Sequence, residues 1–369
     1  MKSTVAKIYL DNFRENLHFI RSKMNKNTKM CVAIKADAYG HGAIECAKVA
    51  EECGVEYLAI ARVSEGVQLR RAGIGADLLL LSLCDPSEMD ELVQNRITPL
   101  VFDSEYVDLV ANAAKKAGVQ NYAVHLAVDT GMGRIGCYPE DAGKLAKKIV
   151  SDGLFFGGIC THFSVSDSKN EDDVLYTKNQ FARFLSAIEN VRRAGIEPGI
   201  RHCAASAPTL FCPEMHLDMC RPGIVCYGYY PGDFTGDDLK PVMSLITKVS
   251  AIRRIKAGES ISYGRTWTAK KDTNVAVLPV GYADGLLRRH AGIFVSIDGK
   301  SYPICGRICM DQCMVDIGDD KIERWNEAVI FGPKESGAIL SAKEIADGAG
   351  TIPYEITCAV SKRVARVFV

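Results

Sequence analysis

The sequence lacks both a charge imbalance and a long apolar run. Lys plus Arg and Asp plus Glu each total 45 among the 369 residues, and no basic patch with interleaved aromatic residues occurs. Neither nucleic acid nor an anionic membrane is therefore an expected partner. Because no apolar run reaches about 18 residues and the first ten residues contain no signal-peptide core, we also expect no membrane span and no secretion signal.

The sequence also lacks the cysteine spacing of a small disulfide scaffold, although it contains 14 cysteines. Several of them, such as Cys31, Cys160, Cys226 and Cys305, lie inside apolar runs. This placement favours reduced, buried thiols. We therefore expect a cytoplasmic protein.

What the sequence does contain is an alternation of apolar strands and helical segments. Strands are predicted at residues 5–10, 31–35, 57–61, 78–83, 98–102, 123–128, 155–161, 199–203 and 217–226. Helices are predicted after Asp11, a suitable capping residue, and at 44–53, 65–72, 88–94, 106–117, 142–150 and 176–193. About eight such units predict an α/β fold with an N-terminal (β/α)8 barrel, whose active site lies at the C-terminal strand ends. A doubly wound open sheet is the alternative, but it normally needs fewer units.

The chain is long enough for a second domain, and its pattern changes near residue 235. Residues 230–240 are rich in turn formers, so we predict a barrel over 1–235 and a mostly antiparallel β domain over 236–369. Short β-rich segments are expected within 242–255 and at 275–280, 294–297 and 313–317, with a helix at 342–348. Residues 1–10 are expected to add a strand to this second domain.

Lys35 stands where an apolar run ends and a glycine-rich polar turn begins. Residues 30–34 read as a buried parallel strand, and residues 36–42 are Ala-Asp-Ala-Tyr-Gly-His-Gly. Lys35 is therefore predicted at the C-terminal end of a barrel strand, where the following loop leaves it accessible. A lysine that only marks the strand's exit to solvent is the alternative.

Polar and glycine residues follow several later strands of the predicted barrel. Arg134 could clamp a carboxylate, and Ser206, Gly223 and Ile224 have the chemistry of a phosphate site. Taken singly, His162 is more often a core histidine and Arg134 a surface ion-pair partner. A lysine beside a phosphate cradle, with no P-loop motif and no metal-ligand cluster, suggests pyridoxal phosphate held through a Schiff base.

Motifs along the whole chain resemble those of the alanine racemase family, the pyridoxal-phosphate enzymes built from a barrel and a β domain. They are AIKADAYGHG at 33–42, DTGMGR at 129–134, THF at 161–163, RPGI at 221–224, SYGR at 262–265, VGYADG at 280–285 and CMDQ at 309–312. The resemblance implies a homodimer in which the β domain of one subunit completes the active site on the barrel of the other. It also implies a small-molecule substrate, alanine, and a role in supplying D-alanine for the cell wall.

The resemblance assigns a role to each matching residue. Lys35 would hold the cofactor and act as the base on one face of the substrate α-carbon, with Tyr263 of the partner subunit on the other face. Arg221 would face the pyridine nitrogen, and His162 and Arg221 would connect to the tyrosine and favour its anion. The implied phosphate contacts are Tyr39, Ser206, Gly223, Ile224 and Tyr354. Arg134 and the Met310 backbone would hold the substrate carboxylate, Tyr282 and Tyr354 would narrow the entrance, and Asp311 would lie at its edge.

Two positions depart from the family pattern. Ala127 stands where many members carry a carbamate-modified lysine, which orients the arginine that corresponds to Arg134. We predict that a chloride ion, water or another side chain takes its place. Ala205 replaces the usual asparagine before the phosphate-binding serine, so this loop is expected to differ in detail.

Three other functions fit parts of the pattern. A serine racemase or a broader small amino-acid racemase shares the architecture, although Tyr354 in its usual family form favours alanine. An amino-acid decarboxylase would place a carboxylate opposite the pyridine nitrogen, which Arg221 argues against. A non-catalytic pyridoxal-phosphate carrier is a lone barrel and has no use for Tyr263 or for Met310 and Asp311.

Overall fold

In the computed structural model, which describes residues 3–369, the N-terminal half forms one parallel sheet of eight strands. They are β2 (Lys29–Ala33), β3 (Tyr57–Ile60), β4 (Asp77–Leu80), β5 (Ile97–Val101), β6 (Ala123–Ala127), β7 (Phe155–Cys160), β8 (Ile200–His202) and β9 (Met219–Cys220). The spatial order runs from β8 through β7 to β2 and then β9. Hydrogen bonds from Asp218 N to Arg201 O (3.1 Å) and from Arg221 N to Ala204 O (2.7 Å) join the ends of this order. The predicted (β/α)8 barrel is confirmed.

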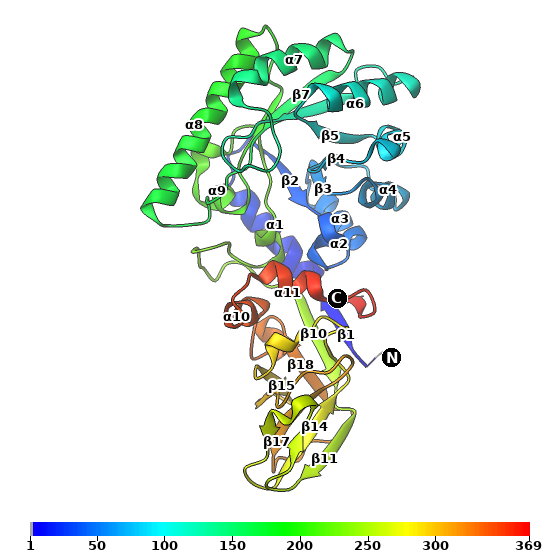
Figure 1. Ribbon diagram of the computed structural model, residues 1–369, viewed down its shortest axis with the longest axis vertical. Coiled ribbons are helices and arrows are strands. Elements are labelled where there is room, and N and C mark those ends of the chain that lie inside the picture. The colour runs from blue at the N-terminus through cyan, green and yellow to red at the C-terminus, as the bar shows by residue number, and fades with distance from the viewer. Residues whose placement is uncertain (1–2) are drawn as a thin grey trace.

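Helices connect the strands and surround the sheet (Figure 1). The longer ones are α1 (Leu10–Lys23), α3 (Ala43–Glu52), α4 (Val63–Arg71), α5 (Met89–Gln94), α6 (Ser104–Lys116), α7 (Ala142–Ser151), α8 (Glu171–Arg193) and α9 (Ser206–Phe211). All the helices predicted in this half are present. The predicted start at residue 176 was wrong, because Asn170 caps α8 by accepting a hydrogen bond from Asp172 N.

Two further predictions in the barrel were wrong. Asp11 does not cap α1: the cap position is Tyr9, and Asp11 lies in the first turn, where it pairs with Arg14. The strand predicted at 217–226 contains only β9, and residues Ile224–Tyr227 form the 3-10 helix η4 instead. Pro222 has no N–H to donate to a strand ladder, which explains why the apolar run stops pairing there.

The C-terminal half contains a six-stranded sheet. Its order is β16 (Lys300–Pro303), β15 (Phe294–Ile297), β18 (Glu327–Phe331), β10 (Met243–Lys248), β1 (Val5–Ile8) and β19 (Ala365–Phe368). The N-terminal strand β1 therefore pairs antiparallel with β10 and parallel with β19. The mostly antiparallel character predicted for this half is confirmed.

A smaller antiparallel sheet of β11 (Ala251–Ile255), β14 (Thr273–Leu278) and β17 (Cys313–Gly318) lies beyond it, with the short pair β12 (Ser260–Ile261) and β13 (Trp267–Thr268). The predicted helix at 342–348 is α10 (Ala342–Gly348), whereas α11 (Pro353–Ala359) was not predicted. No described helix or strand lies between η4 and β10, so the expected boundary segment is irregular. The division at residue 235 stays a prediction.

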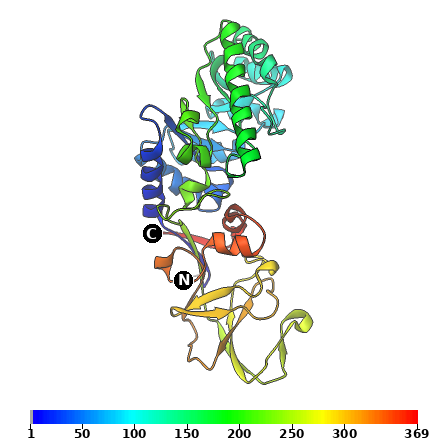
Figure 2. The ribbon, with the colours of Figure 1, turned by 90° about the vertical axis from the view of Figure 1, so that its left-hand side faces the viewer.

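The molecule is elongated, with the barrel at one end and the β sheets at the other (Figures 1 and 2). Helix α11, near the C-terminus, lies at the junction between them. Among residues 3–369, no helix combines the length and the apolar character that crossing a bilayer requires.

Candidate active site

Lys35 lies just beyond strand β2, as the first residue of a short turn, α2 (Lys35–Tyr39). The turn is left-handed: Ala36, Asp37, Ala38 and Tyr39 have φ angles of 53°, 55°, 55° and 53°. For residues with a side chain this conformation costs roughly 1–2 kcal/mol each. A run of four such residues next to a lysine marks a backbone that its surroundings hold in place.

Three contacts hold this left-handed turn. Ala36 N donates to Glu65 Oε1 (2.7 Å), and Ala43 N donates to Asp37 Oδ1 (2.8 Å). Gly40, with φ 86°, lies so close to α11 that an added Cβ would stand 2.3 Å from the carbonyl oxygen of Thr357. The C-terminal segment therefore supports the turn that carries Lys35. Sequence reasoning missed Glu65 and Thr357, since nothing in their local pattern connects them to Lys35.

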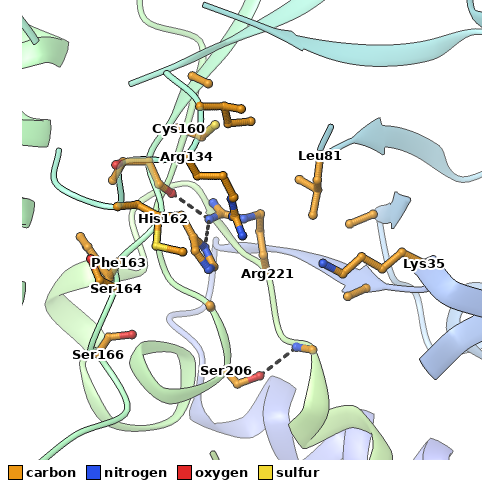
Figure 3. Close-up of a pocket in the computed structure, with 18 of the residues that line it drawn as sticks. Lys35, Leu81, Arg134, Cys160, His162, Phe163, Ser164, Ser166, Ser206 and Arg221 are labelled. Carbon is orange, nitrogen blue, oxygen red and sulfur yellow. Dashed lines mark hydrogen bonds between the residues drawn. The ribbon is translucent and has the colours of Figure 1, made fainter. Parts of the chain in front are cut away.

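Lys35 opens into a cavity of about 590 Å³ at the C-terminal ends of the barrel strands. In Figure 3 it extends from one side of this pocket toward Arg221 and His162 on the other. Of the predicted site residues, the cavity is lined by Lys35, Tyr39, Arg134, His162, Ser206, Arg221, Gly223 and Tyr354. The structure therefore brings together residues that are more than 300 positions apart in the chain.

The cavity is electropositive. Its lining includes the cations Lys35, Arg134 and Arg221 but a single carboxylate, Asp167. Desolvation, followed by repulsion from Arg134, lowers the pKa of Lys35 from its usual value. A larger share of neutral amine at a given pH makes this lysine a better nucleophile and base.

Arg221 is the centre of a buried hydrogen-bond chain. Its guanidinium donates to Thr161 O (2.8 Å) and to His202 Nδ1 (2.7 Å), and it lies 3.4 Å from His162 Nδ1. His202 Nε2 is in turn 2.8 Å from His125 Nδ1. Because the guanidinium has only N–H donors, His202 accepts at Nδ1 and therefore donates from Nε2. Neither His202 nor His125 was expected to support Arg221.

The three histidines around Arg221 are neutral. Desolvation, and then repulsion from Arg221, lowers the pKa of His125 and of His162 to about 3 and that of His202 well below its usual value. The permanent positive charge in this network is thus that of Arg221 alone. That His162 and Arg221 connect to Tyr263 of the partner subunit stays a prediction.

A polar cradle lies where the loops after β8 and β9 meet. Gly223 N donates to Ser206 Oγ (3.0 Å), and a Cβ on Gly223 would stand 3.0 Å from the Tyr39 hydroxyl. The Tyr39 ring packs 5.5 Å from that of Tyr354, between centroids. Desolvation raises the pKa of both tyrosines, so both stay protonated donors. Ile224 follows Gly223 at the start of η4, fully buried and outside the cavity lining.

Arg134 lines the cavity, as do Ala127 and Cys160. Within residues 3–369, no side chain forms a hydrogen bond or ion pair with its guanidinium. Of the three replacements predicted for the missing lysine, a neighbouring side chain is therefore not seen. A chloride ion or water beside Ala127 stays a prediction.

The remaining predicted residues form a second group on the β domain and do not line this cavity. Tyr263, Met310 and Tyr282 are 68%, 52% and 38% exposed. Tyr263 begins the 3-10 turn η5 (Tyr263–Arg265), directly after Ser262, whose φ is 63°. Asp311 follows Met310 and pairs with Arg363. We call Tyr263, Tyr282, Met310 and Asp311 the presented cluster.

Comparisons with known proteins match the whole chain. The family models for the N-terminal and the C-terminal domain of alanine racemase match residues 8–231 and 242–368. Alanine racemase of Treponema denticola is 48% identical over all of this chain and 99% of its own length. Alanine racemase of Treponema pallidum is 42% identical, with both chains fully covered.

Solved structures agree with these relatives. Alanine racemase of Clostridium difficile 630 superimposes with a TM-score of 0.93 at 37% identity, covering 100% of this chain and 96% of that one. The enzyme from Streptomyces coelicolor A3(2) gives 0.94 at 34% identity, covering 100% and 98%. With its barrel, its β domain and its lysine-bearing cavity, the chain belongs to the alanine racemase family.

Proposed function

We propose that this protein interconverts L-alanine and D-alanine. The observation that carries the proposal is the electropositive cavity at the barrel mouth, in which Lys35 faces Arg221, in a chain that matches alanine racemases from end to end. The decarboxylase alternative would place a carboxylate opposite the pyridine nitrogen, and Arg221, on the side of the pocket that faces Lys35, argues against it. Neither a serine racemase nor a lone cofactor carrier is favoured by the relatives.

The cofactor that the residues fit is pyridoxal phosphate. The cradle of Tyr39, Ser206 and Gly223 offers two hydroxyl groups and lets a ligand approach the Gly223 backbone closely. A Cβ at Gly223 would occupy that space. An excess of cations over carboxylates in the lining suits a phosphate dianion. A volume of about 590 Å³ lies in the usual range for small-molecule sites. When bound, the cofactor withdraws electrons from the substrate α-carbon and thereby acidifies its proton.

The protein's own residues divide the remaining work. Lys35 would hold the cofactor aldehyde and, once released by the substrate amine, exchange a proton with one face of the α-carbon. Tyr263 of the partner subunit would exchange a proton with the opposite face, because inversion requires removal on one side and return on the other. Arg221 would face the ring nitrogen, where a permanent cation cannot accept a proton.

Other residues would bind and orient the ligand. Tyr39, Ser206, Gly223, Ile224 and Tyr354 are the proposed phosphate contacts, and Arg134 with the Met310 N–H of the partner would hold the substrate carboxylate. Tyr354 and the partner's Tyr282 would narrow the entrance, with the partner's Asp311 at its edge. The exposure of the presented cluster supports a homodimer with shared sites, built from a barrel over 1–235 and a β domain over 236–369. A cytoplasmic location stays a prediction.

A chiral assay tests the proposal. Purified protein incubated with pyridoxal phosphate and L-alanine is expected to approach equal amounts of both enantiomers, and an absorbance scan should show the cofactor bound to an amine. L-serine and L-leucine serve as alternative substrates. Formation of carbon dioxide without D-alanine, or cofactor binding without any turnover, would overturn the proposal in favour of a decarboxylase or a carrier.

A further inference from the structure

Arg363 bridges two carboxylates of the β domain. Its Nε lies 2.8 Å from Asp284 Oδ1, and one of its terminal nitrogens lies 2.7 Å from Asp311 Oδ1. The Asp284 side chain is only 7% exposed, whereas those of Arg363 and Asp311 are about half exposed. Asp284 Oδ2 also accepts a hydrogen bond from Gly281 N (2.9 Å). One guanidinium thus joins a buried acid to an acid of the presented cluster.

Two of the three segments that carry the presented cluster, those of Tyr282 and Met310, pack backbone against backbone. Tyr282 N donates to Cys309 O (3.1 Å), and Ala283 N donates to Met310 O (3.0 Å). A Cβ on Gly281 would stand 2.4 Å from Met310 O, so only glycine permits this approach. The Met310 N–H itself has no hydrogen-bond partner among residues 3–369. It is left free to donate to a ligand.

The segment that carries Arg363 is itself held by several hydrogen bonds. Arg366 donates to the carbonyl oxygens of Val360, Ser361 and Val364 and, from Nε, to Gly40 O (2.9 Å). Ser361 N donates to Asp284 O (3.1 Å). Arg363 therefore projects from a turn that is fixed on both sides. A fork held in this way can set the position of what it grips.

We propose that Arg363 is a positioning residue. The buried Asp284 anchors Arg363, and Arg363 holds Asp311, so that the adjacent Met310 N–H and Tyr282 meet the substrate in the partner's active site. The inference rests on the proposed function, in which the presented cluster serves the partner subunit. Loss of the guanidinium frees the 309–312 loop to move, and a displacement of about 1 Å can cost on the order of 100-fold in an oriented site.

Steady-state kinetics of the dimeric holoenzyme give the first test. Arg363→Ala is expected to raise KM for L-alanine about 10- to 100-fold while kcat changes less, because substrate placement is lost and Lys35 is not. Arg363→Lys keeps a positive charge but cannot pair with two carboxylates through a planar guanidinium. Its KM should lie between those of Arg363→Ala and the wild-type protein. Arg254→Ala is the matched control: Arg254 is half exposed and pairs with Asp319 on the same domain, and it should keep wild-type constants.

Mixed dimers decide in which subunit Arg363 acts. A dimer of one Lys35→Ala subunit and one Arg363→Ala subunit contains one intact site if Arg363 serves the partner, and it should show about half the wild-type kcat with wild-type KM. If Arg363 serves its own pocket, neither site is intact and activity stays low. A dimer of Lys35→Ala and Tyr263→Phe subunits is the reference for a shared site.

The outcomes separate the two proposals. Wild-type constants in Arg363→Ala, or recovery in the reference dimer without recovery in the Arg363 dimer, overturn the positioning role alone. No recovery in the reference dimer overturns the shared site and the positioning role with it. If Arg363→Ala does not fold, Asp311→Asn removes only the exposed arm of the bridge, and wild-type KM in that variant would equally overturn the inference.

Discussion

The barrel-mouth pocket and the presented cluster are built in opposite ways. In the pocket, Arg221 and the polar cradle are buried and hydrogen-bonded within one chain, and Lys35 is partly enclosed by them. In the cluster, Tyr263 and Met310 are mostly exposed, and neither lines the barrel-mouth cavity. In the proposed homodimer, each chain would therefore carry one finished half of a site and one half that gains its environment only from the partner.

The two regions nevertheless share one device, a strained backbone beside a residue proposed to handle protons. Lys35 precedes the left-handed turn, and Tyr263 follows Ser262, which has a φ of 63°. Ser262 Oγ donates to Arg307 O (2.5 Å), and Glu65 accepts from Ala36 N. In both places contacts from distant segments maintain a conformation that the local sequence disfavours.

Removal of the Lys35 amine tests the barrel half of the proposed site and has the largest expected effect on activity. Lys35→Ala should lower kcat for racemisation at least about 10⁴-fold, since both cofactor attachment and one proton transfer depend on it. A chiral alanine assay measures this. Lys48→Ala, an exposed lysine paired with Glu45, is the control, and substantial activity in Lys35→Ala would contradict the assignment.

Removal of the Tyr263 hydroxyl tests the half of the proposed site that the presented cluster supplies. Tyr263→Phe should lower kcat about 10²- to 10⁴-fold, the usual contribution of a general acid or base, while cofactor absorbance stays unchanged. Tyr138→Phe is a matched control, because Tyr138 is a barrel residue that is 63% exposed. Unchanged turnover in Tyr263→Phe would show that this phenol is not the second base.

A methyl group added at Gly223 tests whether the cradle is already shaped to bind the cofactor phosphate. Gly223→Ala places a Cβ 3.0 Å from the Tyr39 hydroxyl and should weaken pyridoxal phosphate binding about 10-fold, as modest overpacking does. Titration of the apoprotein, followed by absorbance, measures the affinity. Gly348→Ala, where a Cβ meets open space, should bind normally, and equal affinities in the two variants would refute the cradle.

Acid should destabilise the barrel through its buried histidines. His125 and His202 are fully buried in the barrel with pKa values far below their usual range, about 3 for His125. Between about pH 6.5 and pH 3 the unfolded chain binds protons that the folded barrel does not, so the free energy of unfolding falls as pH falls. Each such histidine contributes about 1.4 kcal/mol per pH unit in this window.

Denaturant unfolding at fixed protein concentration, from pH 7 to pH 4.5, measures this slope. His125→Asn should reduce the dependence of the unfolding free energy on pH by the contribution of one histidine. It should also lower stability at neutral pH, because the hydrogen bond to His202 is lost. An unaltered slope in His125→Asn would contradict the neutral, buried pair.

Part of this structure follows directly from the sequence. The alternation of apolar strands and helical periods predicts the barrel, because burial on both faces of parallel strands imposes that pattern on the chain. Helix 342–348 and the end of the strand before His162 are found where expected. The roles assigned to Tyr263 and Met310 come from family resemblance, since an exposed tyrosine in a β-rich segment has no local signal of its own.

The errors have local causes as well. Asn170 competes as a cap upstream of the periodic stretch, so α8 starts earlier than its apolar pattern. Pro222 ends the pairing of an apolar run that otherwise reads as strand. Both cases show that apolar periodicity defines the middle of an element better than its ends.

The sequence by itself determined the fold class, the place of Lys35 after a barrel strand and the presence of a second, β-rich half. Only the tertiary structure decided the left-handed turn after Lys35, the chain from Arg221 to His125 and the bridge made by Arg363. The physical reason is that each of these depends on hydrogen bonds between distant segments, such as that of Arg366 with Gly40 across 326 positions. Local backbone preference disfavours the left-handed turn and says nothing about the other two features. All three form only when the packed fold brings the partners together.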